Sequence, residues 1–295
     1  MTSVTGSKEF FKGIPRSRKR KVRRALVVDR RLNLFQVWAY RLLVIAILLA
    51  LWQYLPNVKF LRSISPVFNP FFVSSPTQVA RAVWGLLTGT NGQVSIWPYF
   101  LFTLESSVIG TALGIFFGAV VGLILSNDVR ARQVFTPFVN FGNSAPLVAV
   151  IPVIIVIFGP TKLSSIVIGC MAAFFSVFFN AYAGGRTVPI EMLQNAQLFG
   201  ATPFTAMYRL RFQFVIAWTF AGLPNAISHS LLAVVTTEVL GGAPGVGRLI
   251  EIALGQDDAT TTFAILVILA VAGALIVGLA DMTRRHVLHW LPDER

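Results

Sequence analysis

The sequence predicts an all-α membrane protein with six transmembrane helices and both termini in the cytoplasm. Hydrophobic residues make up 55% of the 295 residues and charged residues only 13%, whereas soluble domains carry about 25% charged residues. The apolar residues are gathered into long runs, and the basic residues are concentrated beside them, as is typical of cytoplasmic flanks. The net charge of +13 therefore reflects membrane topology, and we expect no nucleic-acid partner.

Residues 1–36 are predicted to form a basic cytoplasmic tail, and residues 37–295 the transmembrane domain. Eleven Lys and Arg residues lie from Lys8 to Arg31, before the first apolar run. In one interpretation, these charges do no more than orient the chain in the membrane. They can also attract membrane lipid, because each basic residue near anionic headgroups adds about 1 kcal/mol of attraction. Both interpretations stay open.

Six apolar runs are long enough to cross a bilayer, which takes about 20 residues of helix. They cover residues 37–54, 101–125, 134–158, 163–184, 214–240 and 261–282. The segments that carry Arg130, Arg209 and Arg284 then fall on the same side as the N-terminal tail. The six-span arrangement is thus self-consistent, with these segments in the cytoplasm.

A short helix is predicted on the opposite side, between the first two spans. Ser75 and Pro76 can start it, and the stretch from Thr88 to Gly92 can end it. Its apolar residues recur at helical spacing, which is typical of an amphipathic helix at a membrane surface.

Four glycines of the second span predict a close helix contact. Gly110, Gly114, Gly118 and Gly122 recur every four residues and share one helix face. Small residues on one face let another backbone approach closely in the membrane. We therefore expect these glycines to serve packing.

The third span is interrupted by proline and polar residues. Pro137, Pro146 and Pro152 break the helical pattern. Irregular backbone at membrane depth is tolerated only against protein or a water-filled path, so the span can line a pore, or it can be kinked for packing alone. The candidate pathway residues in and around it are Asn143, Ser144, Pro146, Ser176 and His229.

Glu238 is the acid most deeply placed in a predicted span. Intramembrane acids are costly and mark functional sites, so we expect its side chain to face a water-filled path or an interface between two copies. A glycine-rich turn with Gly245 and Gly247 follows it. Glu238 can accept hydrogen bonds from this turn and fix an outer gate, or it can contact the transported solute.

The sequence offers no catalytic chemistry. No Gly-x-x-x-x-Gly-Lys-Ser/Thr phosphate-binding loop is present, so ATP hydrolysis by that route is excluded. Cys170 is the only cysteine, which excludes an intramolecular disulfide. We expect no catalytic residue, no metal and no cofactor in this chain.

A polar stretch at residues 189–213 separates the fourth and fifth spans. Pro189 and Glu191 favour the start of a helix, and Gly200 is placed to end it. Pro203 can start a second short helix that ends within the stretch. The expected structure is a helix, a sharp turn and another short helix on the membrane surface.

This stretch resembles the cytoplasmic coupling loop of ABC-transporter permeases of the binding-protein-dependent importer class. That loop has Glu-Ala-Ala, three residues, and then Gly. Here Ala196 and Gly200 match, whereas Gln194 and Asn195 replace Glu and Ala. The departures bear on how strongly an ATPase docks. By this resemblance the coupling residues are Glu191, Gln194, Asn195, Ala196, Gly200 and Ala201.

Glu238 and the turn through Gly245 and Gly247 are similar to a segment of the nitrate, sulfonate and taurine importer permeases. With Ser75–Pro76 and Pro146, the similarity extends over about residues 70–292. It implies the type I ABC importer permease fold in a bacterial inner membrane. The solute implied is small and polar, like nitrate, sulfonate, taurine, bicarbonate or a thiamine precursor.

The resemblance also implies partners. These are a second permease copy, an extracytoplasmic solute-binding protein, and cytoplasmic ATPase subunits that bind ATP and Mg. The alternative is a secondary transporter or channel that acts alone.

Overall fold

The computed structural model of the protein describes residues 34–54, 74–90, 92 and 94–287. These residues form ten helices, and no strand occurs among them, which confirms the predicted all-α class. The chain divides between Tyr54 and Leu55 into two units. Most of the predicted basic tail, residues 1–33, lies outside the described residues.

The first unit contains one described helix, α3 (Leu34–Tyr54). It corresponds to the first predicted span. Its apolar side chains are exposed all round; Leu42, for example, is 62% exposed. A helix that is apolar on every side belongs in a membrane or a protein core, and α3 is long and apolar enough to cross a bilayer.

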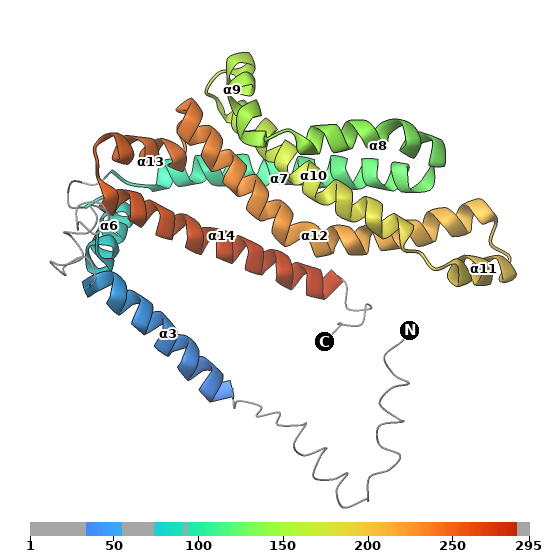
Figure 1. Cartoon of the computed structure of the whole chain (residues 1–295), viewed down its shortest axis with the longest axis horizontal. Helices are drawn as coiled ribbons and strands as arrows, with labels where there is room; N and C mark the ends of the chain where they lie inside the picture. The colour runs from blue at the N-terminus through green and yellow to red at the C-terminus, as the bar shows by residue number, and fades with distance from the viewer. Residues whose placement is uncertain (1–33, 55–73, 91, 93, 288–295) are drawn as a thin grey trace, which may run out of the picture. The chain divides into compact units, whose positions relative to one another are not determined.

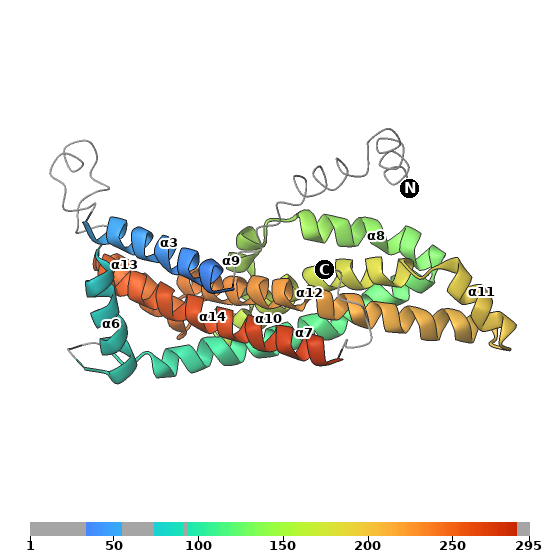
Figure 2. The ribbon, with the colours of Figure 1, turned by 90° about the horizontal axis from the view of Figure 1, so that it is seen from below.

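The second unit is built around three long helices. These are α7 (Trp97–Asn127), α10 (Lys162–Arg186) and α12 (Pro203–Gly241), which pack side by side (Figure 1). A fourth, α14 (Ala259–Val287), lies along α12, and α6 (Pro76–Thr88) crosses one end of α14 (Figure 2). The core between α7, α10 and α12 includes Ala173, Val177 and Ala226.

Helix α6 confirms the predicted amphipathic helix. It starts after Ser75 with Pro76 in its first turn and ends at Gly89, whose φ is 67°. Val79 and Leu86 are buried, whereas Trp84 on the other side is 65% exposed. The apolar stripe therefore faces the helices of its own unit.

The four glycines of α7 face α10, as predicted. A Cβ atom on Gly114 would lie 2.5 Å from Cβ of Ala173 and 2.7 Å from the carbonyl oxygen of Cys170. A Cβ atom on Gly122 would lie 2.7 Å from Cβ of Ala181. Because such distances are too short for real side chains, only glycine allows this approach of the two backbones.

The third predicted span is two helices rather than one. Helices α8 (Val129–Ser144) and α9 (Leu147–Phe158) meet at 91°. Pro146 causes the break, since it lacks an N–H and holds Ala145 in an extended conformation with φ −68° and ψ 128°. Pro137 and Pro152 lie inside α8 and α9 without ending them.

A second bend of 48° lies between α12 and α13 (Val246–Gly255). Among the described residues, four helices are each long and apolar enough to cross a membrane, namely α3, α7, α10 and α14. The number reaches six when each bent pair counts as one span. The predicted orientation stays a prediction.

The close contact between α7 and α10 gives a stability test. We expect Gly114→Val to push the two helices apart and to cost about 1–3 kcal/mol, as overpacking of a core does. The measurement is the temperature at which purified protein loses its size-exclusion peak. Gly278→Val on α14 is the matched control, because a Cβ there meets nothing within 4 Å; equal melting of both variants would contradict the close contact.

Candidate functional site

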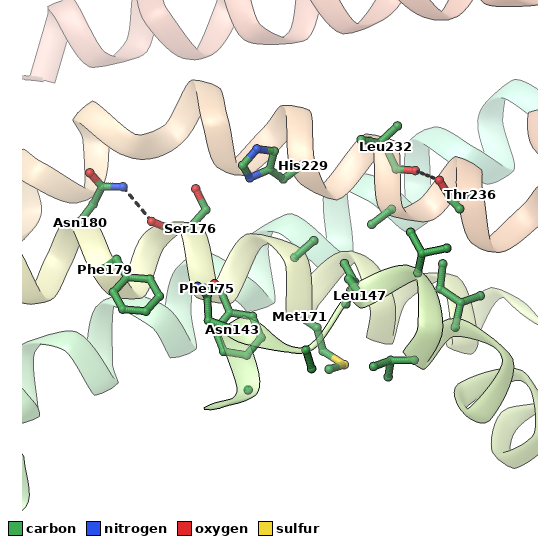
Figure 3. Close-up of a pocket in the computed structure, with 17 residues that line it drawn as sticks. Asn143, Leu147, Met171, Phe175, Ser176, Phe179, Asn180, His229, Leu232 and Thr236 are labelled. Atoms are coloured by element: carbon green, nitrogen blue, oxygen red, sulfur yellow. Dashed lines mark hydrogen bonds between the residues drawn. The ribbon is translucent and has the colours of Figure 1, made fainter. Parts of the chain in front are cut away.

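A cavity of about 780 Å³ lies where α8 and α9 meet α10 and α12 (Figure 3). Three of the predicted pathway residues, Asn143, Ser176 and His229, line it together. They come from α8, α10 and α12, so the fold assembles them from segments far apart in sequence. Ser144 and Pro146 lie at the break between α8 and α9 but are not among the lining residues.

Two further polar residues, Asn180 and Thr236, also line the cavity. Asn180 lies four residues after Ser176 in α10, and Thr236 lies seven after His229 in α12. Residues at these spacings share a helix face. This spacing was the sequence signal that could have added both to the predicted site.

The cavity lining is mostly apolar and holds few free polar groups. The side-chain amide of Asn180 donates to the carbonyl of Ser176 at 2.7 Å, and the hydroxyl of Thr236 donates to the carbonyl of Leu232 at 2.7 Å (Figure 3). The His229 imidazole also belongs to the lining. No Asp, Glu, Lys or Arg is among the described lining residues, so this arrangement suits hydrogen bonding to a polar solute rather than pairing of charges.

Glu238 lies outside this cavity, inside the packing of α7, α12 and α13. Its side chain is 0% exposed. The hydroxyl oxygen of Thr103 lies 2.9 and 2.8 Å from its two carboxylate oxygens. The N–H of Gly247 donates to the carboxylate at 3.0 Å, and the N–H of Val246 donates to Thr103 Oγ1 at 2.8 Å.

These hydrogen bonds cap the first turn of α13. The first N–H groups of a helix have no partner within the helix, and they favour a nearby negative charge. Here Thr103 of α7 and Glu238 of α12 supply the acceptors. The neighbouring glycines make room, since a Cβ on Gly245 would overlap the Glu238 carboxylate and one on Gly247 would lie 2.6 Å from Glu238 Cβ.

The predicted hydrogen bond between Glu238 and the glycine-rich turn is therefore present. The prediction that Glu238 faces a water-filled path or an interface is wrong. A helix N-terminus and a hydroxyl replace water around the carboxylate, so Glu238 needs no contact with solvent. Gly245 and Gly247 belong to this cap rather than to the cavity lining.

The predicted coupling segment begins with α11 (Ile190–Leu198), which has no buried residue. Glu191 lies in the first turn of α11, and the helix ends before Gly200, whose φ is 86°. Leu198 is 84% and Phe199 92% exposed. Gln194, Asn195 and Ala196 lie within the helix, and Ala201 lies just beyond its end.

The prediction of a second short helix after Pro203 is wrong. Pro203 does start a helix, capped by the hydroxyl of Thr202, but this helix is the 39-residue α12. Arg209 and Arg211 therefore lie in its early turns and not at a helix end. The sequence between Pro203 and Phe214 contains no breaker, which explains the continuity.

Comparison with known proteins decides the family. The sequence profile of the family described as "Binding-protein-dependent transport system inner membrane component" matches residues 110–289, more than half of the chain. The chain belongs to this family. The resemblance to ABC importer permeases of the nitrate, sulfonate and taurine type is thereby confirmed.

Two relatives and one solved structure illustrate the similarity. The permease is 26% identical over 223 residues to the riboflavin transport system permease protein RibX of Chloroflexus aurantiacus, covering 76% of this chain and 82% of that protein. It is 25% identical over 245 residues to the taurine transport system permease protein TauC of Escherichia coli, covering 82% and 86%. Its fold resembles a chain in the crystal structure of an amino acid ABC transporter with histidines, with a TM-score of 0.54, 17% identity, and coverage of 66% of this chain and 94% of that one.

These relatives are subunits of ABC importers, so the alternative of a secondary transporter or channel acting alone is set aside. The permease is a membrane subunit with several apolar helices. In the described part of the chain, no group of three or more His, Cys, Asp and Glu residues could hold a metal ion.

The Glu238 cap predicts a loss of stability without a change in solute preference. Glu238→Gln leaves one acceptor oxygen and no charge at the α13 N-terminus, so we expect a cost of about 1–3 kcal/mol, seen as a lower melting temperature of the purified permease. Glu251→Gln is the control, because Glu251 forms a half-exposed ion pair with Arg248 at 2.7 Å and such pairs contribute about 0–1 kcal/mol. Unchanged melting with altered solute preference would place Glu238 in the solute path instead.

Proposed function

We propose that the permease moves a small polar solute through the cavity and couples this movement to ATP hydrolysis in separate partner subunits. The observation that carries the proposal is α11, a helix with no buried residue, whose last residue Leu198 and the following Phe199 are both more than 80% exposed. Exposed apolar groups of this kind mark interaction sites. The ATPase partner, which binds ATP and Mg, docks on this segment through Glu191, Gln194, Asn195, Ala196, Gly200 and Ala201.

The solute path in this proposal is the cavity where α8 and α9 meet α10 and α12. Asn143, Ser176 and His229 supply hydrogen-bonding groups, and Asn180 and Thr236 complete the polar lining. Ser144 and Pro146 shape the break beside it, whereas Glu238, Gly245 and Gly247 hold α13. The solute is of the nitrate, sulfonate, taurine, bicarbonate or thiamine-precursor kind, in keeping with a taurine-transport relative.

The remaining parts of the proposal are the partners and the membrane. A second copy of the permease forms a homodimer with this one, and an extracytoplasmic solute-binding protein delivers the solute on the side of α6 and α13. The membrane is the bacterial inner membrane. The residue 1–36 tail, the coupling segment and the C-terminus lie in the cytoplasm.

Docking on α11 is tested at Gly200. Gly200→Glu should abolish solute uptake while the permease still accumulates in the membrane fraction, because the position has open space within 4 Å in this chain but a long, charged side chain there would interfere with a docked partner. Gly200→Asn is the control, since Asn tolerates the left-handed backbone at this position. Normal uptake by the Glu variant with the ATPase attached would refute this docking site.

The orientation is tested by labelling with a membrane-impermeant thiol reagent in a Cys170→Ser background. Thr90→Cys follows α6, and Arg130→Cys lies in the first turn of α8; both positions are exposed. We expect the first to label in intact spheroplasts and the second only after lysis. The reverse pattern would overturn the proposed topology.

A further inference from the structure

The C-terminal end of α7 is held by an arginine of α12. The Nη1 of Arg211 donates to the carbonyl oxygen of Ser126 at 2.7 Å and to the side-chain oxygen of Asn127 at 3.2 Å. The amide nitrogen of Asn127 in turn donates to the carbonyl of Leu123 at 2.9 Å. The last turn of α7 thus receives hydrogen bonds from its own side chains and from α12.

Elementary helix chemistry explains this contact. The last four carbonyls of an α-helix have no partner within the helix, and a cation near them is favoured by the helix dipole. Arg211 supplies both a donor and a positive charge. It belongs to none of the ion pairs found among the described residues. Both of the hydrogen bonds that Nη1 donates thus end on the last turn of α7, as in a helix cap.

The end of α10 is packed into the same junction. A Cβ on Gly185 would overlap the Ser126 side chain and would lie 3.1 Å from Val215 of α12. A Cβ on the preceding Gly184 would lie 2.6 Å from the Trp218 side chain. Two consecutive glycines thus bring α7, α10 and α12 together within about two turns of Arg211.

This junction sits at the base of the coupling segment. Helix α10 leads into α11 and α12 leads out of it, while α11 itself has no buried residue. The position of α11 relative to the bundle is therefore set by the helix ends on either side of it. Arg211 is the side chain that ties the outgoing end to α7 by hydrogen bonds.

We propose that Arg211 is a positioning residue that locks the coupling segment to α7, so that movement imposed on α11 by a partner ATPase reaches the helix bundle. The inference rests on the proposed function, because it needs a partner on α11. Without the Arg211 contacts, α11 and the first turns of α12 move without moving α7. The solute-binding protein on the other side of the membrane then no longer controls the rate of ATP hydrolysis.

The test uses the complete complex, reconstituted in proteoliposomes with its ATPase subunits. Hydrolysis of Mg-ATP is measured with and without the solute-binding protein as purified from cells, and each rate is divided by the amount of ATPase in the vesicles. We expect Arg211→Gln to lower the stimulation by the binding protein about threefold or more, in line with mutations that disturb coupling. A residue needed only for folding would reduce the amount of complex and leave this ratio unchanged.

Three further variants make the test specific. Arg211→Lys keeps the charge and a donor and should retain part of the stimulation, and Asn127→Ala should lower it less than Arg211→Gln does. Arg130→Gln removes an exposed arginine beside the junction and should match the wild type. The proposal is overturned if the Arg211→Gln complex is stimulated by the binding protein as strongly as the wild type. If Arg211→Gln does not reach the membrane, the proposal is overturned when the Arg211→Lys and Asn127→Ala complexes are both stimulated as strongly as the wild type. A wild-type complex with no stimulation at all would instead refute the proposed function, and this inference with it.

Discussion

One buried carboxylate connects three helices of the permease, and the arrangement of α12 and α13 at that end of the bundle depends on it. Glu238 of α12 and Thr103 of α7 together accept both of the hydrogen bonds that α13 offers at its N-terminus. An unpaired carboxylate within a membrane protein would be costly. Here the cost is offset because the carboxylate, the Thr103 hydroxyl and the two N–H groups of α13 form hydrogen bonds with one another. The bend of 48° between α12 and α13 is thereby fixed in place.

Different constraints hold the middle and the other end of the bundle. In the middle, glycines let the backbones of α7 and α10 approach one another, and few side chains lie between them. At the far end, Arg211 and the Gly184–Gly185 pair join α7, α10 and α12. The three long helices are therefore held together at both ends and in the middle, whereas α8 and α9 are separated from each other by the break at Pro146. The cavity lies along that break.

Much of this arrangement was predictable from local patterns. The glycine spacing in α7 predicted a close helix contact, and Pro76, Gly89 and Gly200 marked helix ends because each has a specific backbone preference. The glycine-rich turn after Glu238 predicted its hydrogen bond. The environment of Glu238 was not predictable, since its second partner, Thr103, lies 135 residues away. The 91° angle at Pro146 and the role of Arg211 were likewise hidden, because both depend on which helices pack together and not on sequence spacing.

The uncharged lining of the cavity has an electrical consequence. An ion that crosses a membrane exchanges about 2.3 kcal/mol per elementary charge for each 100 mV of potential. The described cavity lining carries no Asp, Glu, Lys or Arg, so a rearrangement of its walls moves none of these charges through the field. If the solute crosses through this cavity as proposed, the charge of the solute contributes to the work that membrane voltage does there, and the voltage dependence of transport then carries information on that charge.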